Sequence, residues 1–231
     1  MSAAPRMSAI DIEFGGELLT LLADKAVVWS REKTLFLADV HLGKAASFRA
    51  AGVAVPSGHS RADIDRIAGL IEQYRIDRLI VLGDLVHNRA SYTPALDAAM
   101  TEFATRHRAL ERVLVLGNHD HHAGAPPADW GFTCVAEDLP LASLVAAHEP
   151  LSPGQQSTEP YARLCGHIHP AISLRTARES VNLPCFWQST KQLVIPSFGS
   201  LTGRYTVTPA QGDVTYVVTR QQIFRIPNAA L

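Results

Sequence analysis

The middle of the chain alternates short apolar runs with amphipathic segments. The runs are largely apolar and each ends at a polar residue or a Gly-polar pair; they occupy residues 34–38, 79–82, 113–116, 144–147 and 163–165. Short, continuous apolar runs are typical of strands that are covered on both faces. The pattern therefore predicts a largely parallel sheet inside the protein.

Two segments between these runs have helical spacing. Ser60 and Asp63 form a capping-box-like pair ahead of Ile64, Ile67 and Ile71, which repeat at the spacing of one helix face. Residues 94–107 predict a second helix with proline in its first turn. Strand, helix and strand in this order indicate right-handed crossovers within the parallel sheet.

Both ends of the chain are rich in β-type patterns. Runs separated by turn residues occur at 10–14, 18–22 and 26–29, and again at 172–174, 185–187, 193–195, 214–218 and 222–226. Two β-rich ends around a βα middle predict an α/β protein in which a two-sheet β-sandwich is flanked by helices. The sequence contains no linker, repeat or low-complexity segment, so we expect residues 1–231 to form a single domain.

Composition and charge narrow the picture further. The formal net charge is −1 and the pI is about 6.8, so any attraction for phosphate must be local. Cys134, Cys165 and Cys185 form no CxxC pair, and we expect them to be small buried residues in a reducing compartment. Because no apolar run has the length of a membrane span and the N-terminal segment lacks a secretory core, we expect a cytoplasmic protein.

Side chains that bind metals follow all five apolar runs. They are Asp39 and His41, Asp84, Asn118 with His119 and Asp120, His148, and His167 with His169. Ligands of open α/β sheets bind beyond the carboxyl ends of the strands, so these side chains can converge on one rim. Helix caps and Asx turns explain Asp39 or Asp84 singly. They do not explain His, Asp or Asn at every one of the five strand ends.

Together these residues resemble the metal-binding set of the calcineurin-like metallophosphoesterase superfamily. The resemblance implies that family's two-sheet sandwich flanked by helices (the αββα fold) and two adjacent divalent cations. It assigns one cation to Asp39, His41, Asp84 and His169, and the other to Asp84, Asn118, His148 and His167, with Asp84 as the bridge. Every ligand position of the family's pattern is present.

A narrower resemblance rests on residues 39–49 (DVHLGKAASFR), Val55-Pro56 and His148-Glu149-Pro150. These motifs are similar to those of the ligase-associated DNA-damage-response phosphoesterases, which are endonucleases. Val40 stands where that family tends to have leucine. The resemblance implies a DNA substrate that is single-stranded or nicked, a role in DNA repair, and functional association with a DNA ligase, a helicase and an exonuclease.

The residue types suit phosphoester hydrolysis. Mixed imidazole and oxygen ligands favour Mn, Fe or Zn over Mg, and we expect two Mn ions. Water between two such ions loses a proton near neutral pH, and the bridging hydroxide attacks phosphorus. His119 is the imidazole left over beside Asn118, so we expect it to protonate the leaving alkoxide. We expect Asp120 to orient His119 and keep it protonated.

Other residues near the motifs are candidates for substrate contacts. Lys44 and Arg49 follow the first ligand loop and can hold phosphate, although a solvated loop explains them equally well. Arg89 and Arg204 are weaker candidates. We expect His87 to be a turn residue, and we expect exposed positions for the remaining loop histidines, His121 and His122.

Two other functions stay open. One is a phosphodiesterase or phosphatase for small or cyclic nucleotides, which the near-neutral charge favours. The other is a scaffold that has kept the fold and lost activity, which the complete ligand set opposes.

Overall fold

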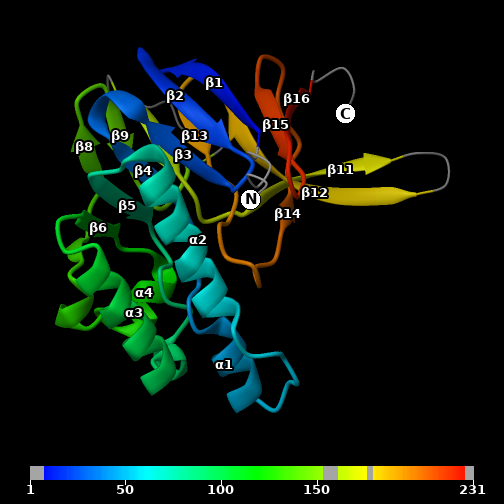
Figure 1. The fold of residues 1–231 in the computed structure, drawn as a ribbon. Helices are drawn as coiled ribbons and strands as arrows, with labels where there is room; N and C mark the ends of the chain where they lie inside the picture. The colour runs from blue at the N-terminus through cyan, green and yellow to red at the C-terminus, as the bar shows by residue number, and fades with distance from the viewer. Residues whose placement is uncertain (1–7, 153–160, 176–178, 227–231) are drawn as a thin grey trace, which may run out of the picture.

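The computed structural model describes residues 8–152, 161–175 and 179–226, and Figure 1 shows two packed β-sheets with helices alongside. The first sheet has seven strands in the order β1 (Ala9–Phe14), β2 (Glu17–Leu22), β3 (Ala26–Trp29), β4 (Thr34–Leu37), β5 (Arg78–Leu82), β6 (Glu111–Val115) and β7 (Thr133–Val135). Pairing is antiparallel from β1 to β4 and parallel from β4 to β7. The predicted α/β sandwich flanked by helices is confirmed.

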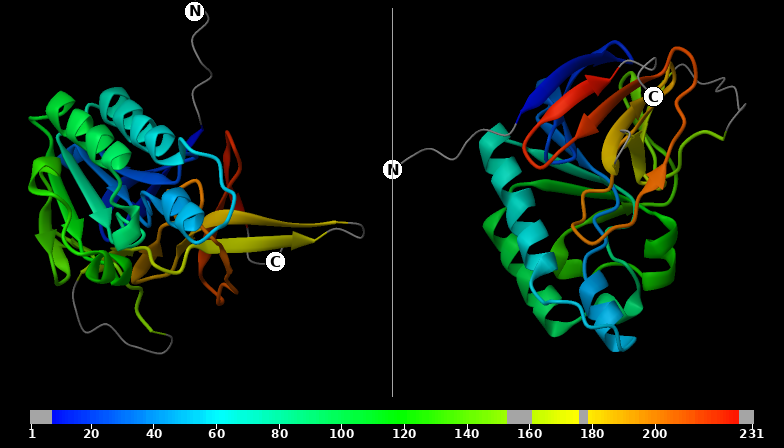
Figure 2. Two further views of the ribbon diagram at one scale, coloured as in Figure 1. Left: turned by 90° about the horizontal axis from the view of Figure 1, so that it is seen from below. Right: turned by 90° about the vertical axis from the view of Figure 1, so that its right-hand side faces the viewer.

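The second sheet is built from the C-terminal half of the chain. Its main path is β14 (Tyr205–Thr206), β11 (Pro170–Arg175), β12 (Ser180–Gln188), β13 (Gln192–Val194), β10 (Ala162–Cys165), β9 (Leu144–Ala146) and β8 (Leu139–Leu141). β15 (Val214–Val218) pairs with β12, and β16 (Ile223–Ile226) pairs with β15. The β11–β12 hairpin projects away from the rest of the molecule (Figures 1 and 2).

Helices lie beside the parallel part of the first sheet. α2 (His59–Tyr74) and α3 (Pro94–Arg106) are the crossover helices, while α1 (Lys44–Ala50) and α4 (Asn118–Ala123) begin in the loops after β4 and β6. Short 3-10 turns are η1 (Ser30–Glu32), η2 (Arg89–Ser91) and η3 (Ala128–Trp130). No helix of the described residues is both long enough and apolar enough to cross a bilayer.

Alternate residues of the central strands face two different cores. Leu35 and Leu37 of β4 pack in one cluster with residues of α2 and α3. Phe36, between them, packs in another cluster with strands of both sheets, including Leu164 and Phe186. Because each central strand is covered on both faces, its sequence is apolar at consecutive positions.

The predicted capping box of α2 is wrong. The helix begins at His59 after Gly58, and Ser60 instead accepts a hydrogen bond from the backbone N–H of Gly43 at 2.9 Å. This bond ties the first ligand loop to α2. The start of α3 is as predicted, because the Thr93 side chain accepts from Leu96 N–H and Pro94 occupies the first turn.

Two further expectations change in the structure. Cys165 and Cys185 are buried as predicted, but Cys134 is exposed because it lies in β7, the edge strand of the first sheet. The sequence of residues 123–130 (AGAPPADW) predicts an exposed loop, but this segment contains η3, and Trp130 at its end is fully buried. The sequence of residues 150–160 predicts a second exposed loop, most of which, residues 153–160, lies outside the described residues.

Candidate metal centre

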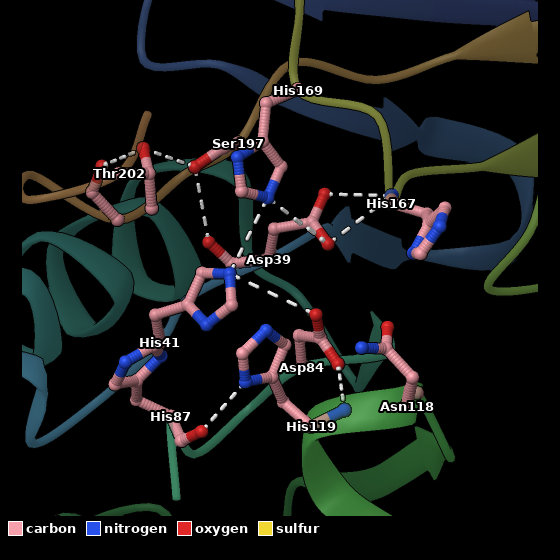
Figure 3. Close-up of polar contacts among 12 residues, drawn as sticks. Asp39, His41, Asp84, His87, Asn118, His119, His167, His169, Ser197 and Thr202 are labelled. Atoms are coloured by element: carbon pink, nitrogen blue, oxygen red, sulfur yellow. Dashed lines mark hydrogen bonds and ion pairs between the residues drawn. The ribbon is translucent and has the colours of Figure 1, made fainter. Parts of the chain in front are cut away.

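The five ligand-bearing loops meet where the carboxyl ends of strands from both sheets face one another. Asp39, Asp84 and Asn118 follow β4, β5 and β6 of the first sheet. His148 and His167 follow β9 and β10, which run parallel in the second sheet. Figure 3 shows side chains from both sheets directed into one space. The convergence predicted from the strand ends is present.

Backbone strain is concentrated at the ligand positions. Nine non-glycine residues of the described chain have positive φ, and five of them are Asp39, His41, Asp84, His167 and His169. This left-handed region is costly for residues with a Cβ, and it persists where the surrounding structure enforces it, often at functional sites. In this conformation the Asp-x-His and His-x-His pairs leave the strand direction, and both members of each pair face the site.

One cluster of ligand atoms forms around Asp39. The Nε2 atoms of His41 and His169 lie 3.3 Å apart, and Asp39 Oδ1 is 3.6 Å from His169 Nε2. Asp84 Oδ2 approaches His41 Nε2 at 3.8 Å. These four side chains are the set that the resemblance assigns to one cation.

A second cluster forms around His148. Its Nε2 lies 3.0 Å from His167 Nδ1 and 3.0 Å from Asn118 Oδ1. Asp84 Oδ1 is 3.7 Å from the same nitrogen. The two carboxylate oxygens of Asp84 thus face different clusters, which is the geometry that a bridging ligand requires.

The donor set fits divalent cations. Nδ1 of His148 donates to the Leu82 carbonyl at 3.0 Å, and Nδ1 of His169 donates to the Gly203 carbonyl at 3.2 Å. Since a neutral imidazole carries one proton, each Nε2 then has a lone pair directed at the cluster. Lone pairs about 3 Å apart repel one another unless a cation lies between them.

Electrostatics support the same fit. Burial, and then the charge of Lys44 and the neighbouring imidazoles, lower the pKa of His41 to about 2, so its ring is a neutral ligand at pH 7. Burial raises the pKa of Asp84; His148 opposes this rise and the nearby Asp39 carboxylate adds to it. Two buried carboxylates side by side are stable as anions only with compensating positive charge.

Two glycines allow the loops to approach this closely. A Cβ on Gly83, where φ is +81°, would lie 2.0 Å from His148 Nδ1. A Cβ on Gly117 would lie 2.3 Å from Asp84 Oδ1. The Gly residues of the Gly-Asp and Gly-Asn motifs are therefore required by contact with the ligands themselves.

His119 lies in the first turn of α4, beside the ligand Asn118. Its backbone N–H donates to Asp84 Oδ1 at 2.9 Å, and its ring meets the His41 ring edge-on at 4.8 Å between centroids. Nδ1 donates to the carbonyl oxygen of His87 at 2.7 Å. Figure 3 shows the other ring nitrogen directed toward the space between His41 and Asp84.

The predicted contact between Asp120 and His119 is wrong. The buried Asp120 carboxylate accepts from the backbone N–H groups of Asp84, Gly117 and Val86 at 2.7, 3.0 and 3.3 Å. Because consecutive helical residues point about 100° apart, the two side chains of α4 diverge. Asp120 therefore holds the ligand loops together, and another residue orients His119.

His87 is the site residue that the sequence assigned to a turn. Its ring stacks on His119 at 4.9 Å and meets His41 edge-on at 5.3 Å. Backbone pairing explains its position, since His87 N–H donates to the Leu42 carbonyl and Val86 bridges to Leu42. The available signal was its place three residues after Asp84, on the loop that the metal motif positions.

The predicted phosphate contacts occupy different environments. Burial lowers the pKa of Lys44, and the Asp84 and Asp39 carboxylates oppose this shift, so its ammonium group interacts with the metal centre. The guanidinium of Arg49 instead donates to the carbonyls of Val55 and Pro56. Arg89 and Arg204 are exposed, as are His121 and His122, whose predicted surface positions are confirmed.

Comparison with known proteins identifies the family. The calcineurin-like phosphoesterase family matches residues 32–178, more than half of the chain. The chain belongs to the calcineurin-like phosphoesterase family. The predicted family is thus confirmed, and its fold implies divalent metal ions. The protein is therefore a metal-dependent phosphoesterase, and its set of candidate metal ligands is complete.

Two solved structures resemble this calcineurin-like phosphoesterase. The nuclease MPE of Pseudomonas putida is 35% identical to it, with a TM-score of 0.81 over 95% of this chain and 100% of that chain. The E. coli phosphoesterase Yfce is 16% identical, with a TM-score of 0.40 over 84% of this chain and 97% of that chain. No curated protein sequence matches the chain.

Proposed function

We propose that this protein is a manganese-dependent endonuclease that hydrolyses the phosphodiester bonds of single-stranded or nicked DNA, in cytoplasmic DNA repair. The observation that carries the proposal is the pair of ligand clusters that share Asp84. The imidazole of His119 lies beside them and belongs to neither of the two clusters. The similarity to a nuclease over nearly the whole chain favours a nucleic acid over other phosphoesters, and the narrower motif resemblance favours DNA. Association with a DNA ligase, a helicase and an exonuclease is proposed on the narrower motif resemblance alone.

Two groups of residues would hold the two cations that hydrolysis requires. Asp39, His41 and His169 would hold one cation, and Asn118, His148 and His167 the other, with Asp84 shared. When bound, the two cations supply positive charge for the phosphate and a nucleophile from water at neutral pH.

His119 supplies the proton that the leaving oxygen needs. With Nδ1 donating to the His87 carbonyl, the other ring nitrogen is the one available for proton transfer. Lys44 adds a cation that interacts with the same centre and can hold a phosphate oxygen.

The alternatives differ in what they require. A phosphodiesterase for small nucleotides needs the same metal centre and no surface for a long strand. An inactive scaffold would tolerate the loss of a metal ligand or of His119. This chain has every ligand of the predicted set and His119 as well.

The test compares three substrates in the presence of Mn: circular single-stranded DNA, a cyclic nucleotide and bis-nitrophenyl phosphate. We expect internal nicking of the circle, loss of all activity on chelation, and better recovery with Mn than with Mg or Ca. Asp84→Asn should abolish nicking, whereas the control Asp77→Asn, an exposed aspartate ion-paired with Lys33, should retain it.

The outcomes separate the functions. Consumption of the cyclic nucleotide with an intact DNA circle would replace the endonuclease by a small-nucleotide phosphodiesterase. Failure on all three substrates with two metals bound would support the scaffold. Nicking that survives in Asp84→Asn would point to a contaminating nuclease.

A further inference from the structure

A cavity of about 830 Å³ borders the metal centre on the side of His169. Its walls come from the β2–β3 turn, α2, the segment 197–204, the start of β11, the middle of β12, and the β15–β16 turn. These segments lie far apart in sequence. The cavity is distinct from the two ligand clusters and shares only His169 with them.

His169 lies between the metal centre and the cavity. Its Nε2 faces Asp39 and His41 in the first cluster, and its Nδ1 donates to the Gly203 carbonyl in the cavity wall. Ser197 and Thr202 lie beside this ring in Figure 3, and both line the cavity. A strand leaving the metal centre past His169 therefore enters this cavity directly.

The cavity is strongly cationic. Lys25, Arg66, Arg204 and Arg220 line it, and Asp24 is the one carboxylate among its lining residues, although the whole chain has a net charge of −1. Arg66 is paired with Asp63, which leaves three cations. None of these three forms an ion pair with a carboxylate of the described residues. Such a local concentration of positive charge attracts anions.

Lys25 has an unusual position for a lysine. It is half-buried in the β2–β3 turn with φ of +66°, and its ammonium reaches the Gly199 carbonyl at 3.3 Å. Burial, and then the charge of Arg66, lower its pKa to about 7. A strained and partly desolvated ammonium with no carboxylate in ion-pair contact costs stability, and such costs are retained where they serve binding.

The wall beside Lys25 is rigid. The Arg66 guanidinium donates to the carbonyls of Phe198 and Asp24, and it lies 4.0 Å above the Phe198 ring. Arg204 makes a single hydrogen bond to the Asn182 carbonyl at 2.7 Å and is otherwise exposed. Lys25 and Arg204 are thus, together with Arg220 of the β15–β16 turn, the lining cations with donors to spare.

We infer that this cavity binds the backbone phosphate of the nucleotide next to the scissile bond, with Lys25 and Arg204 as its contacts. The inference rests on the proposed DNA substrate and adds a site for the strand beyond the metal centre. The cavity also provides the local positive surface that a DNA strand requires, on a protein whose net charge is nearly zero.

The test uses the double variant Lys25→Gly/Arg204→Gln in the metal-loaded enzyme. Glycine adopts positive φ without strain, so it removes the ammonium without disturbing the turn. The matched control is Lys33→Gly/Arg78→Gln, because Lys33 also has positive φ, at 44°, and because Lys33 precedes β4 and Arg78 begins β5, at the end of the sheet away from the ligand loops. Binding of oligothymidylate as a function of salt is measured at about pH 6, where the Lys25 ammonium is protonated. Cleavage of DNA and of bis-nitrophenyl phosphate is measured alongside.

We expect the test variant to bind oligothymidylate at least about tenfold more weakly, with a salt slope lower by about 1.4 for two lost phosphate contacts on a single strand. Its loss of cleavage should be far greater for DNA than for the small diester, and the control should match the wild type. If the wild type cuts DNA and the test variant keeps its affinity and salt slope, the cavity assignment is overturned alone. If the wild type neither binds nor cuts DNA, the assignment and the proposed function both fail.

Discussion

The carbonyl oxygen of His87 accepts a hydrogen bond from Nδ1 of His119 at 2.7 Å, and the two rings stack at 4.9 Å between centroids. One residue therefore orients His119 twice, through its backbone and through its ring. Neither contact adds a negative charge beside His119. The imidazole is held in place while its other nitrogen is left for the substrate.

His119→Ala is expected to separate chemistry from metal binding. Turnover of DNA should fall by about 10²–10⁴-fold, the usual effect of a lost general acid, with metal content unchanged. Bis-nitrophenyl phosphate should lose much less, because its leaving group needs no proton. The control His121→Ala lies on the same helix and is exposed. Equal losses on both substrates would contradict the acid role.

His87→Ala is expected to act through His119. The backbone carbonyl survives this change, so only the contacts of the His87 ring with His119 and His41 are lost, and DNA cleavage should fall less than in His119→Ala. The double variant His87→Ala/His119→Ala should then be no worse than His119→Ala alone, because coupled residues are not additive. Fully additive losses in steady-state rates would show that His87 acts independently of His119.

Asp84→Ala is expected to empty both cation sites, since its two oxygens face the two clusters. Asn118→Ala removes a ligand from one cluster only and should leave about one tightly held ion per chain. Elemental analysis of the purified proteins measures both. Two ions retained in Asp84→Ala would rule out the bridging position.

Gly83→Ala is expected to destabilise the protein by about 2 kcal/mol or more and to lower metal occupancy, because the added methyl group meets His148 and φ is unfavourable. Gly69→Ala is the matched control: Gly69 is exposed on α2, and its Cβ would meet nothing within 4 Å. That substitution should stabilise by about 0.5–1 kcal/mol. Denaturant unfolding compares the two, and equal effects would contradict the packing argument.

The sequence predicted those parts of the fold and site that depend on local pattern. Continuous apolar runs located the central strands, and polar residues at their ends located the ligand loops. The orientation of Asp120 could not be predicted, because it depends on where α4 begins. The position of His87 depends on backbone pairing between two loops, which leaves no signal in either loop alone.

The sequence pointed to Arg204 as a weaker candidate for substrate contact, but it did not predict the cationic cavity that Arg204 lines. Lys25 and Arg204 are separated by most of the chain, and they line one space only because the β2–β3 turn of the first sheet approaches the segment before β14. Neither residue lies in a recognisable motif. Ser60 shows that a local pattern can also give a wrong prediction. Its sequence context fits a helix cap, but in the structure its side chain accepts a hydrogen bond from Gly43 instead.

Lys25 is expected to make the free energy of unfolding depend on pH. Its pKa is lowered from 10.5 to about 7, by burial and then by Arg66 and Arg204, while Asp63 and Asp24 oppose the shift. Between these values the unfolded chain keeps a proton that the folded protein releases, so this group makes stability rise with pH. The cost is fully present below about pH 7 and disappears above the unfolded pKa.

Lys25→Gly removes this cost, whereas Lys33→Gly removes an exposed lysine from a similar backbone conformation. Both variants gain from relief of positive φ at every pH. Only Lys25→Gly should gain more at about pH 6 than at about pH 10, so its advantage over Lys33→Gly should shrink as pH rises. Urea unfolding of the three proteins across this range measures the difference. A gap that stays constant with pH would mean that the Lys25 ammonium is well solvated in the folded protein.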